Sequence, residues 1–325
     1  MQASKAPTRY GFLLLPNYSM IALSSAIEVL RMANRLSKQT LYQWSTCTMD
    51  GESVLASNQL VIEPGGKIDD VKDLTALIVC GGVRVQQAWS DKLKIVLHTL
   101  ARRKIGLGGI CTGSYVLARA GLLDGYRCTI HWENIAALRE THSEVRVTED
   151  LYEIDRDRMT AAGGSAPLDM FLRVVQKQHG KELAVSISEQ FMCDRMRGQH
   201  DKQRIPIRLI VGTNQPKLTE AIALMESNLE EVIGLDDLSR LVGVSRRQLE
   251  RLFKKYLHCV PRRYYLDLRL KKARQLLLQT DASIAEVSIA CGFVSTPHFS
   301  KSYRDVFAMS PRDERKLRRV ELEVE

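Results

Sequence analysis

The sequence LDDLSRLVGVSRRQLERLFKK spans residues 235–255 and decides the fold of the C-terminal part of the chain. It predicts a short helix that is capped by an aspartate and ends at Gly243, followed by a second helix capped by Ser245. On the second helix Leu249, Leu252 and Phe253 recur at helical spacing, so we expect them to face the core. The outer face is then left to charged side chains, namely Arg246, Arg247, Glu250, Arg251 and Lys254.

A second copy of this pattern follows in the sequence IAEVSIACGFVSTPHFSKSYR, residues 284–304, with a turn at Gly292 and a helix capped by Ser295. Between the copies, residues 261–279 predict one long helix, which spans roughly 28 Å at 1.5 Å per residue. Such a helix can hold two recognition helices near one turn of DNA apart, about 34 Å, so that both enter successive major grooves. The duplicated helix-turn-helix motif therefore predicts binding to double-stranded DNA.

The distribution of charge supports a polyanionic partner. The 325-residue chain has a net charge of +9, and residues 240–274 alone hold twelve basic and two acidic residues. The positive charge is therefore concentrated around the first helix-turn-helix. Seven cysteines without C-x-x-C spacing argue against a disulfide framework and a zinc site, and we expect neither metal nor cofactor. The run 12–15 is too short for a signal peptide or membrane span, so we expect a cytoplasmic protein.

Strand and helix patterns alternate over the first two hundred residues. This alternation predicts an α/β domain with a mainly parallel sheet. Strand patterns lie at 10–15, 41–49, 74–80, 145–148, 151–154 and 159–162, and helical patterns at 21–34, 91–103, 115–120, 133–141, 167–178 and 181–196. We therefore expect a first domain over residues 9–196, a linker over 197–216 and an all-α domain over 217–315.

A strand-to-helix elbow, GICTGS, occupies residues 109–114, and the motif TIHWE follows at 129–133. With these motifs, residues 9–196 resemble the PfpI-type intracellular-protease and glutamine-amidotransferase-like superfamily. The resemblance implies a flavodoxin-like parallel sheet of the class I glutamine amidotransferase type. It also implies that Cys111 stands at the nucleophile position with His131 as a candidate base, and that Gly82 and Thr112 offer backbone N–H groups to an oxyanion.

Three departures from this superfamily argue against an enzyme. Protease members carry a histidine directly after the cysteine, where this chain has Thr112. The acidic residue that the first helix often brings to the thiol would fall near Ala22, and Glu28 lies about two turns further on. The fused DNA-binding domain also gives the first domain another task. We therefore regard Cys111 as a vestigial nucleophile.

The C-terminal hundred residues resemble the AraC/XylS family of transcription activators. The resemblance is carried by residues 245–254 in the first copy and by 290–293, 298–304 and 310–311 in the second. It implies that Arg247, Glu250 and Arg251 reach base edges. Phosphate contacts are assigned to Arg246, Lys254 and Arg304. The second recognition helix lines its groove with Thr296, Pro297, His298, Ser300 and Lys301. We expect the first helix to carry most of the affinity and direct readout, and the second to add register.

The two domains together resemble the GlxA-type branch of AraC regulators, which includes regulators of betaine, carnitine and arginine catabolism. This resemblance implies a regulator, with activation favoured, that responds to a small nitrogenous metabolite and has promoter DNA and RNA polymerase as partners. It also implies a homodimer formed through the first domain. An aromatic ring of Trp132, Tyr18 or Tyr115 could face a quaternary ammonium group. The expected effector site consists of Gly82, Cys111, Thr112, His131 and Trp132.

Two other functions stay open at this point. One is a cysteine-dependent hydrolase or amidotransferase that uses Cys111 and is tethered to DNA, which requires an unusually reactive thiol. The other is a constitutive DNA-binding dimer whose α/β domain only dimerises, which predicts promoter activity indifferent to any metabolite.

Overall fold

The first apolar run of the chain forms β1 (Thr8–Leu14), the second strand of a six-stranded sheet in a computed structural model that describes residues 6–203 and 215–316. The strand order is β2-β1-β5-β6-β10-β9, and every neighbouring pair is parallel except β10 and β9. The other strands are β2 (Tyr42–Cys47), β5 (Ala76–Cys80), β6 (Gly106–Ile110), β9 (Tyr152–Asp155) and β10 (Arg158–Ala161). The expected α/β domain with a mainly parallel sheet is thus confirmed.

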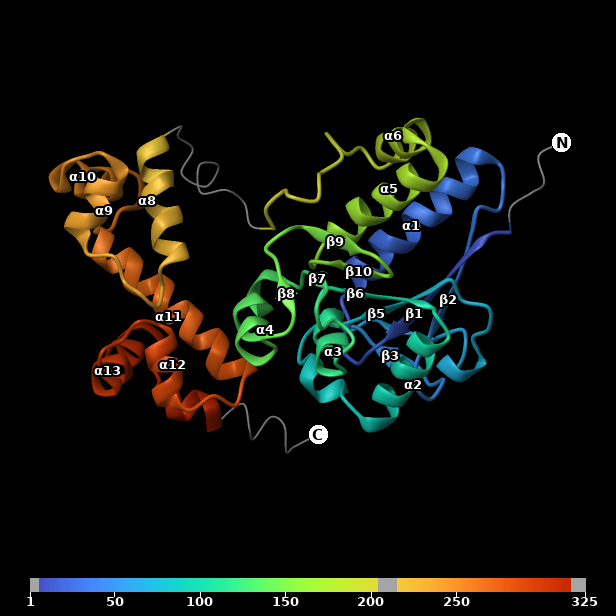
Figure 1. Ribbon diagram of the computed structural model, residues 1–325, viewed down its shortest axis with the longest axis horizontal. Coiled ribbons are helices and arrows are strands. Elements are labelled where there is room, and N and C mark those ends of the chain that lie inside the picture. Colours follow the sequence, from blue (N-terminus) through green and yellow to red (C-terminus); the bar gives the residue numbers. More distant parts are fainter. Residues whose placement is uncertain (1–5, 204–214, 317–325) are drawn as a thin grey trace. The chain divides into compact units, whose positions relative to one another are not determined.

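Helices cover both faces of this sheet (Figure 1). Because side chains alternate along a strand, Phe12 and Leu14 pack on one face while Leu13 and Leu15 pack on the other. The first face is covered by α1 (Met20–Ser37), α5 (Ala166–His179) and α6 (Lys181–Gln190). The second is covered by α2 (Asp91–Arg102), α3 (Gly113–Arg119) and α4 (Ile135–Thr141).

Smaller elements connect these layers. Strands β3 (Val54–Leu55) and β4 (Val61–Ile62) form an antiparallel pair, and β7 (Arg127–Cys128) and β8 (Arg146–Val147) form a parallel pair. Short 3₁₀ turns lie at η1 (Ile68–Asp70), η2 (Val85–Ala88) and η3 (Trp132–Asn134).

The register of the sheet brings four strand ends to one edge. Leu14 is paired with Cys80, Cys80 with Ile110, and Ile110 with Ala161. The segments that leave these four strands therefore begin side by side at the carboxyl edge, where ligands bind in open parallel sheets.

The chain divides into two compact units, residues 1–203 and 204–325. Helix α6 ends at Gln190, six residues before the end expected from the sequence. Residues 197–203, which the sequence placed in the linker, pack on the first unit through hydrogen bonds such as Leu151 N–H to the Gln199 carbonyl, 2.9 Å. The part of the expected linker from 204 to 214 lies outside the described residues.

The described part of the second unit is helical. Its helices are α8 (Pro216–Ser227), α9 (Leu235–Val242), α10 (Arg246–Leu257), α11 (Pro261–Gln279), α12 (Ile284–Ala290) and α13 (Thr296–Phe307). Leu249 and Phe253 of α10 are fully buried against α8 and α9. Leu252 is partly buried in the same cluster.

The helix caps of the second unit agree with the sequence at two of three positions. Ser245 forms a capping box with Gln248, and the Ser295 hydroxyl accepts a hydrogen bond from the His298 N–H. The expected aspartate cap of α9 is wrong, because Gly234 is the N-cap and the two aspartates lie in the first turn. Acidic residues at that position still stabilise the helix by interaction with its dipole. Across residues 6–203 and 215–316, no helix combines the length and apolar character needed to cross a membrane.

Candidate functional site

Cys111 directly follows β6 and sits at the carboxyl edge of the sheet. Its φ of +58° is unusual for a residue with a side chain, as expected of a strained strand-to-helix elbow. The backbone of the elbow is held on both sides, because the Cys111 N–H donates to the Ala161 carbonyl at 3.1 Å and the His131 N–H donates to the Cys111 carbonyl at 3.1 Å. The structure therefore places His131 beside Cys111.

Glycines allow the surrounding segments to approach this elbow. A Cβ on Gly82 would lie 1.9 Å from the carbonyl oxygen of Asn17, and one on Gly163 would lie 2.3 Å from Cδ2 of His131 and 3.4 Å from Sγ of Cys111. The Thr112 hydroxyl donates to the Gly82 carbonyl at 2.7 Å. Gly82, His131 and Gly163 thus converge from three loops on the elbow formed by Cys111 and Thr112.

The Cys111 thiol is poorly suited to nucleophilic attack at neutral pH. Its residue is 8% exposed, and burial raises its pKa to about 11, although hydrogen bonds from the Thr112 backbone and the Ser19 hydroxyl favour the thiolate. The nearby carboxylate of Glu133 raises the pKa further. A thiol of this kind stays protonated, whereas reactive cysteines have lowered pKa values.

His131, Trp132 and Glu133 form a mixed polar and aromatic wall next to the thiol. Burial lowers the pKa of His131, so its imidazole is neutral at pH 7. The Glu133 N–H donates to Nδ1 of His131 at 3.4 Å, and a Glu133 carboxylate oxygen lies 3.8 Å from the same nitrogen. The Trp132 ring centroid lies 5.7 Å from that of His131, and Trp132 is 37% exposed.

Two other aromatic candidates are wrong for this site. Tyr18 is fully buried, with its hydroxyl 3.8 Å from the Met20 sulfur, so its ring cannot face a ligand. Tyr115 stacks edge-on against His142, and its hydroxyl accepts from Arg119. Of the three aromatic candidates, Trp132 is therefore the one that is exposed and contacts the ring of His131.

The first helix brings no carboxylate to the thiol. Ala22 is fully buried in the core under α1. Glu28 pairs with Arg31 on the surface of the same helix, at 2.5 Å between Oε2 and Nη2. The acidic residue beside Cys111 is instead Glu133, which comes from the segment after β7.

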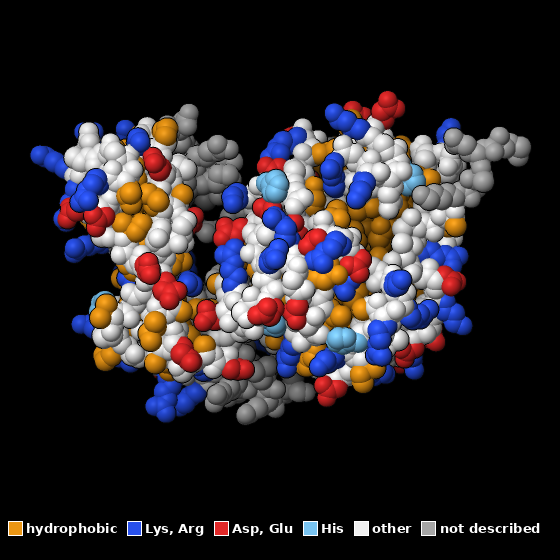
Figure 2. Space-filling model, viewed as in Figure 1, with side chains coloured by type: hydrophobic (Ala, Val, Ile, Leu, Met, Phe, Trp, Pro, Cys, Tyr) orange, Lys and Arg blue, Asp and Glu red, His pale blue; other side chains and the backbone are white. Residues whose placement is uncertain are grey.

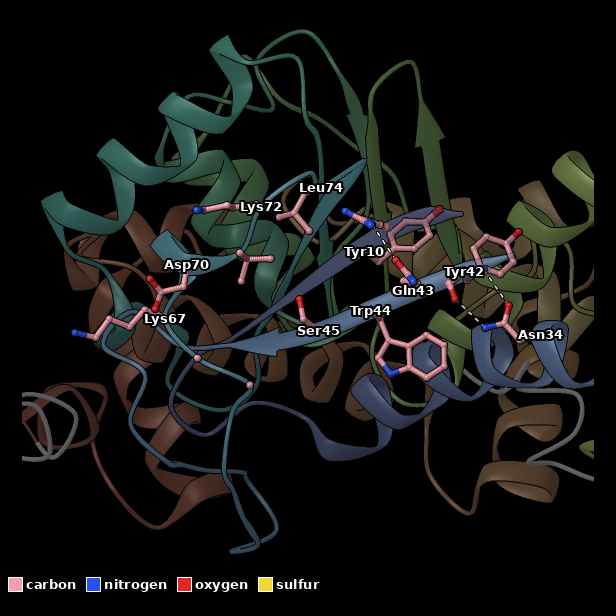
Figure 3. Close-up of a pocket in the computed structure, with 14 residues that line it drawn as sticks. Tyr10, Asn34, Tyr42, Gln43, Trp44, Ser45, Lys67, Asp70, Lys72 and Leu74 are labelled. Atoms are coloured by element: carbon pink, nitrogen blue, oxygen red, sulfur yellow. Dashed lines mark hydrogen bonds between the residues drawn. The ribbon is translucent and has the colours of Figure 1, made fainter. Parts of the chain in front are cut away.

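A groove of about 610 Å³ lies at the opposite edge of the sheet (Figure 3). It is lined at the amino ends of β1, β2 and β5 by residues that include Tyr10, Trp44 and Leu74. Figure 3 shows Lys67 and Lys72 at one end and Trp44 and Asn34 at the other, so its polar groups do not converge on one point. The carboxyl edge at Cys111 is the better candidate for a small-molecule site.

Alkylation tests the state of the Cys111 thiol. With a pKa of about 11, we expect iodoacetamide to modify Cys111 roughly 100-fold more slowly at neutral pH than a thiol of ordinary pKa. The rate should rise with pH until about pH 11, because the thiolate is the reacting species. Peptide mass spectrometry can follow Cys111 with the partly exposed Cys193 as internal reference. Faster labelling of Cys111 than of Cys193 at neutral pH would favour the hydrolase alternative.

The outer face of α10 in the second unit carries exposed basic residues. Arg247, Arg251 and Lys254 are exposed, lie within two turns on one face, and form no ion pair with a described residue. Arg246 is paired with Asp236 at 3.3 Å and with Glu250 at 3.1 Å. Exposed pairs of this kind contribute about 0–1 kcal/mol, so phosphate can replace the carboxylates. Figure 2 shows Lys and Arg side chains over the position of α10, interspersed with carboxylates.

The outer face of α13 is less charged. Pro297, His298, Lys301 and Arg304 are exposed, while Thr296 and Ser300 are partly exposed. Phe299 and Tyr303 are fully buried on the opposite face, and the Tyr303 hydroxyl is hydrogen-bonded to the buried carboxylate of Glu314. All the residues that the sequence assigned to the second recognition surface therefore lie on the side of α13 that faces away from its core.

Part of the positive charge counted around the first motif belongs to the second. Arg269 of α11 donates to the carbonyls of Cys291 and Gly292 at 2.7 and 2.6 Å, and its guanidinium lies 4.0 Å from the ring centroid of Phe293. Lys272 donates to the Ala290 carbonyl at 2.8 Å. These two side chains cap the end of α12 and are therefore engaged within the protein. A count of basic residues alone thus overstates the positive charge that the first helix-turn-helix offers to DNA.

Sequence reasoning missed three residues at the Cys111 site: Ser19, Glu133 and Gly163. Two signals were present in the sequence. Ser19 and Gly163 follow strands, and the carboxyl ends of parallel strands share one edge. Glu133 belongs to the TIHWE motif itself, next to the two residues that were selected.

The chain is similar to known proteins in both units. Residues 238–317 match the family described as Helix-turn-helix domain, and residues 13–177 match the DJ-1/PfpI family. The HTH-type transcriptional regulator GbdR of Pseudomonas aeruginosa is 54% identical over 312 residues, which cover 96% of this chain and 85% of GbdR. The HTH-type transcriptional regulator CdhR of the same species is 45% identical over 306 residues, covering 94% of this chain and 91% of CdhR.

Solved structures agree with this relationship. The crystal structure of an AraC family transcriptional regulator from Pseudomonas putida superimposes with a TM-score of 0.53 and 33% identity, over 57% of this chain and all of that chain. This match covers little more than half of this chain, whereas the matches to GbdR and CdhR extend over both units. The chain belongs to the AraC family of HTH-type transcriptional regulators, in the group whose N-terminal domain has the DJ-1/PfpI fold.

Proposed function

We propose that this regulator responds to a small nitrogen-containing metabolite that binds at the carboxyl edge of the first unit, against Gly82, Cys111, Thr112, His131 and Trp132. The observation that carries the proposal is the combination of a protonated thiol with an exposed wall of aromatic and acidic groups. A thiol pKa of about 11 removes the nucleophile that a hydrolase needs, while the wall retains the groups that recognise a ligand.

The chemistry of the wall favours a cationic nitrogen group. Trp132 offers an exposed indole face, which attracts alkylammonium and guanidinium groups. Glu133 adds a carboxylate that is within reach of the same space, since it acts electrostatically on both Cys111 and His131. The N–H groups of Gly82 and Thr112 and the neutral imidazole of His131 suit a carboxylate at the other end of the ligand. A betaine-like compound or a basic amino acid combines both features.

The second unit provides the output. Arg247, Glu250 and Arg251 would read base edges from α10, with Arg246, Lys254 and Arg304 on phosphates. Thr296, Pro297, His298, Ser300 and Lys301 would contact the adjacent groove from α13. We further propose that the protein binds promoter DNA as a homodimer held by the first unit and recruits RNA polymerase, so that effector binding activates a catabolic operon.

Calorimetry tests the effector site. We expect at least one of glycine betaine, dimethylglycine, carnitine and arginine to bind the full-length protein, and Trp132→Ala to weaken that binding by roughly tenfold because the cation–π contact is lost. Trp44→Ala, in the groove at the opposite edge of the sheet, is the matched control and should bind normally. Binding of none of the four compounds, or equal loss in the two variants, would refute the proposed site.

A further inference from the structure

We infer that Arg197 and Gln203 are positioning residues that fasten the start of the interdomain connection to two segments beside Cys111. One segment is the wall formed by His131, Trp132 and Glu133, and the opposite wall is the loop that contains Gly163. A ligand bound between these two walls therefore acts on the chain that leads to the DNA-binding unit. This inference rests on the proposed function. The segment concerned, residues 195–203, ends where the first unit ends and is here called the anchor segment.

Gln203 holds the wall that carries His131. Its side-chain amide nitrogen lies 2.9 Å from the Thr129 hydroxyl oxygen and 3.0 Å from the carbonyl oxygens of Ile130 and Asp150. Three acceptors around one nitrogen fix the orientation of the amide, because the reverse orientation would place its oxygen against them. Ile130 immediately precedes His131, whose N–H is bonded to the Cys111 carbonyl. Gln203 is therefore one residue removed from the wall.

Arg197 holds the opposite wall. Its backbone N–H and Nε each donate to the carboxylate of Asp169 at 2.9 Å, and Nη2 donates to the Ser165 hydroxyl at 2.8 Å. Asp169 is buried in the first turn of α5, and Ser165 is the N-cap of that helix. The loop directly before this cap contains Gly163, which faces His131 and Cys111. Gln203 and Arg197 thus bind the two segments that enclose the site, one on each side of Cys111.

The part of the anchor segment between these two residues is braced. Asp201 accepts from the Arg195 guanidinium at 2.7 Å and from the Gly198 N–H at 2.6 Å. The Gln199 amide donates to the buried carboxylate of Glu153 at 2.7 Å. A braced segment transmits a displacement of one end to the other, since its internal hydrogen bonds oppose local bending.

One polar atom of Gln203 opposes its docking on the first unit. Its amide oxygen is buried without a hydrogen-bond partner among the described residues, and an unsatisfied buried acceptor disfavours the docked state. A ligand that moves the Thr129–Ile130 backbone therefore acts on a contact whose stability this acceptor reduces. By reciprocity, a change at the anchor must alter the walls of the site.

Hydrogen exchange on the full-length protein without ligand tests this reciprocity. We expect Gln203→Met to raise amide exchange by roughly tenfold in peptides covering residues 129–135, because the wall at His131 loses its contacts with the Gln203 amide. Arg197→Lys should do the same in peptides covering residues 162–168, because Arg197 contacts Ser165 and Asp169. The matched control is Gln176→Met, since the Gln176 amide contacts Arg173 on the outside of α5. Unchanged exchange at residues 129–135 in Gln203→Met, or at 162–168 in Arg197→Lys, would overturn the inference, whatever the ligand.

A second measurement follows the signal to DNA. Operator affinity is measured with and without each compound of the calorimetric panel, in wild type, Gln203→Met and Arg197→Lys, which keeps its charge but loses the forked geometry. We expect the ligand-dependent change in operator Kd, measured at ligand concentrations that saturate each variant in calorimetry, to shrink at least about fivefold in both variants. A full response in both variants would refute the coupling and leave the proposed function intact. Absence of ligand binding to wild type would refute the proposed function, and the exchange result would then decide the coupling alone.

Discussion

Replacement of Gly113 by alanine is expected to destabilise the first unit by on the order of 4 kcal/mol or more, because the added methyl group has no space. Its carbon would lie 2.0 Å from the carbonyl oxygen of Val79 and 2.8 Å from the carbonyl carbon. Both are backbone atoms of β5, which is hydrogen-bonded on both sides and cannot retreat. Helix α3 would have to lift from the sheet, and the elbow at Cys111 would be lost.

Tryptophan fluorescence isolates this effect during denaturant unfolding. The three tryptophans are Trp44, Trp89 and Trp132, and all lie in the first unit. The control is Gly125→Ala, where no atom lies within 4 Å of the added carbon and the positive φ alone costs about 1 kcal/mol. If Gly113→Ala destabilised the protein less than Gly125→Ala, the close contact between α3 and β5 would be wrong.

The features that the sequence predicted best are those encoded locally. The bounds of α11, Pro261–Gln279, agree with the expectation at both ends, because proline at the first turn is a strong helix start. The caps at Ser245 and Ser295 were predictable for the same reason, since a cap bonds only to the residues two or three positions ahead. The parallel sheet followed from alternation of buried runs and amphipathic stretches.

Features that depend on distant contacts were not predictable in this way. Residues 197–203 are polar and show no periodicity, so they were assigned to the linker. Gln203 is held by residues more than fifty positions earlier in the chain. Likewise, Arg269 was counted as free positive charge, although it is bound to carbonyls of the second helix-turn-helix. In both cases side-chain hydrogen bonds between separate segments decide the role of the residue, and hydrophobic patterns do not record such bonds.

At the Cys111 site, too, the local features could be predicted from the sequence, whereas those that depend on distant contacts could not. The thiol, His131 and Trp132 were found because they lie in short motifs. The reactivity of the thiol was left open by the sequence, since it depends on burial and on the neighbours of the sulfur. In the structure the Cys111 thiol is buried and has the carboxylate of Glu133 nearby, and both of these features raise its pKa.

Arg251→Ala should weaken operator binding by about 1–3 kcal/mol, with the loss concentrated at one base pair. Arg251 is exposed on α10 one turn after Arg247, and neither forms an ion pair with a described residue, so both guanidinium groups are available to guanine. Lys254 lies further along the same face and suits phosphate. Lys254→Ala should therefore weaken specific and random DNA alike and reduce the slope of log K against log salt by about one.

Binding to single-base-pair variants of a site selected with the wild-type protein separates these roles. Arg240→Ala is the control, since Arg240 is exposed on α9 and paired with Asp237 at 3.1 Å. If Arg251 reads one base pair, its alanine variant loses affinity for the selected site but binds sites with any of the four base pairs at that position equally. Equal losses on the selected site and on random DNA would instead assign Arg251 to phosphate. Base reading by α10 would then rest on Arg247 and Glu250, the other two residues assigned to base edges.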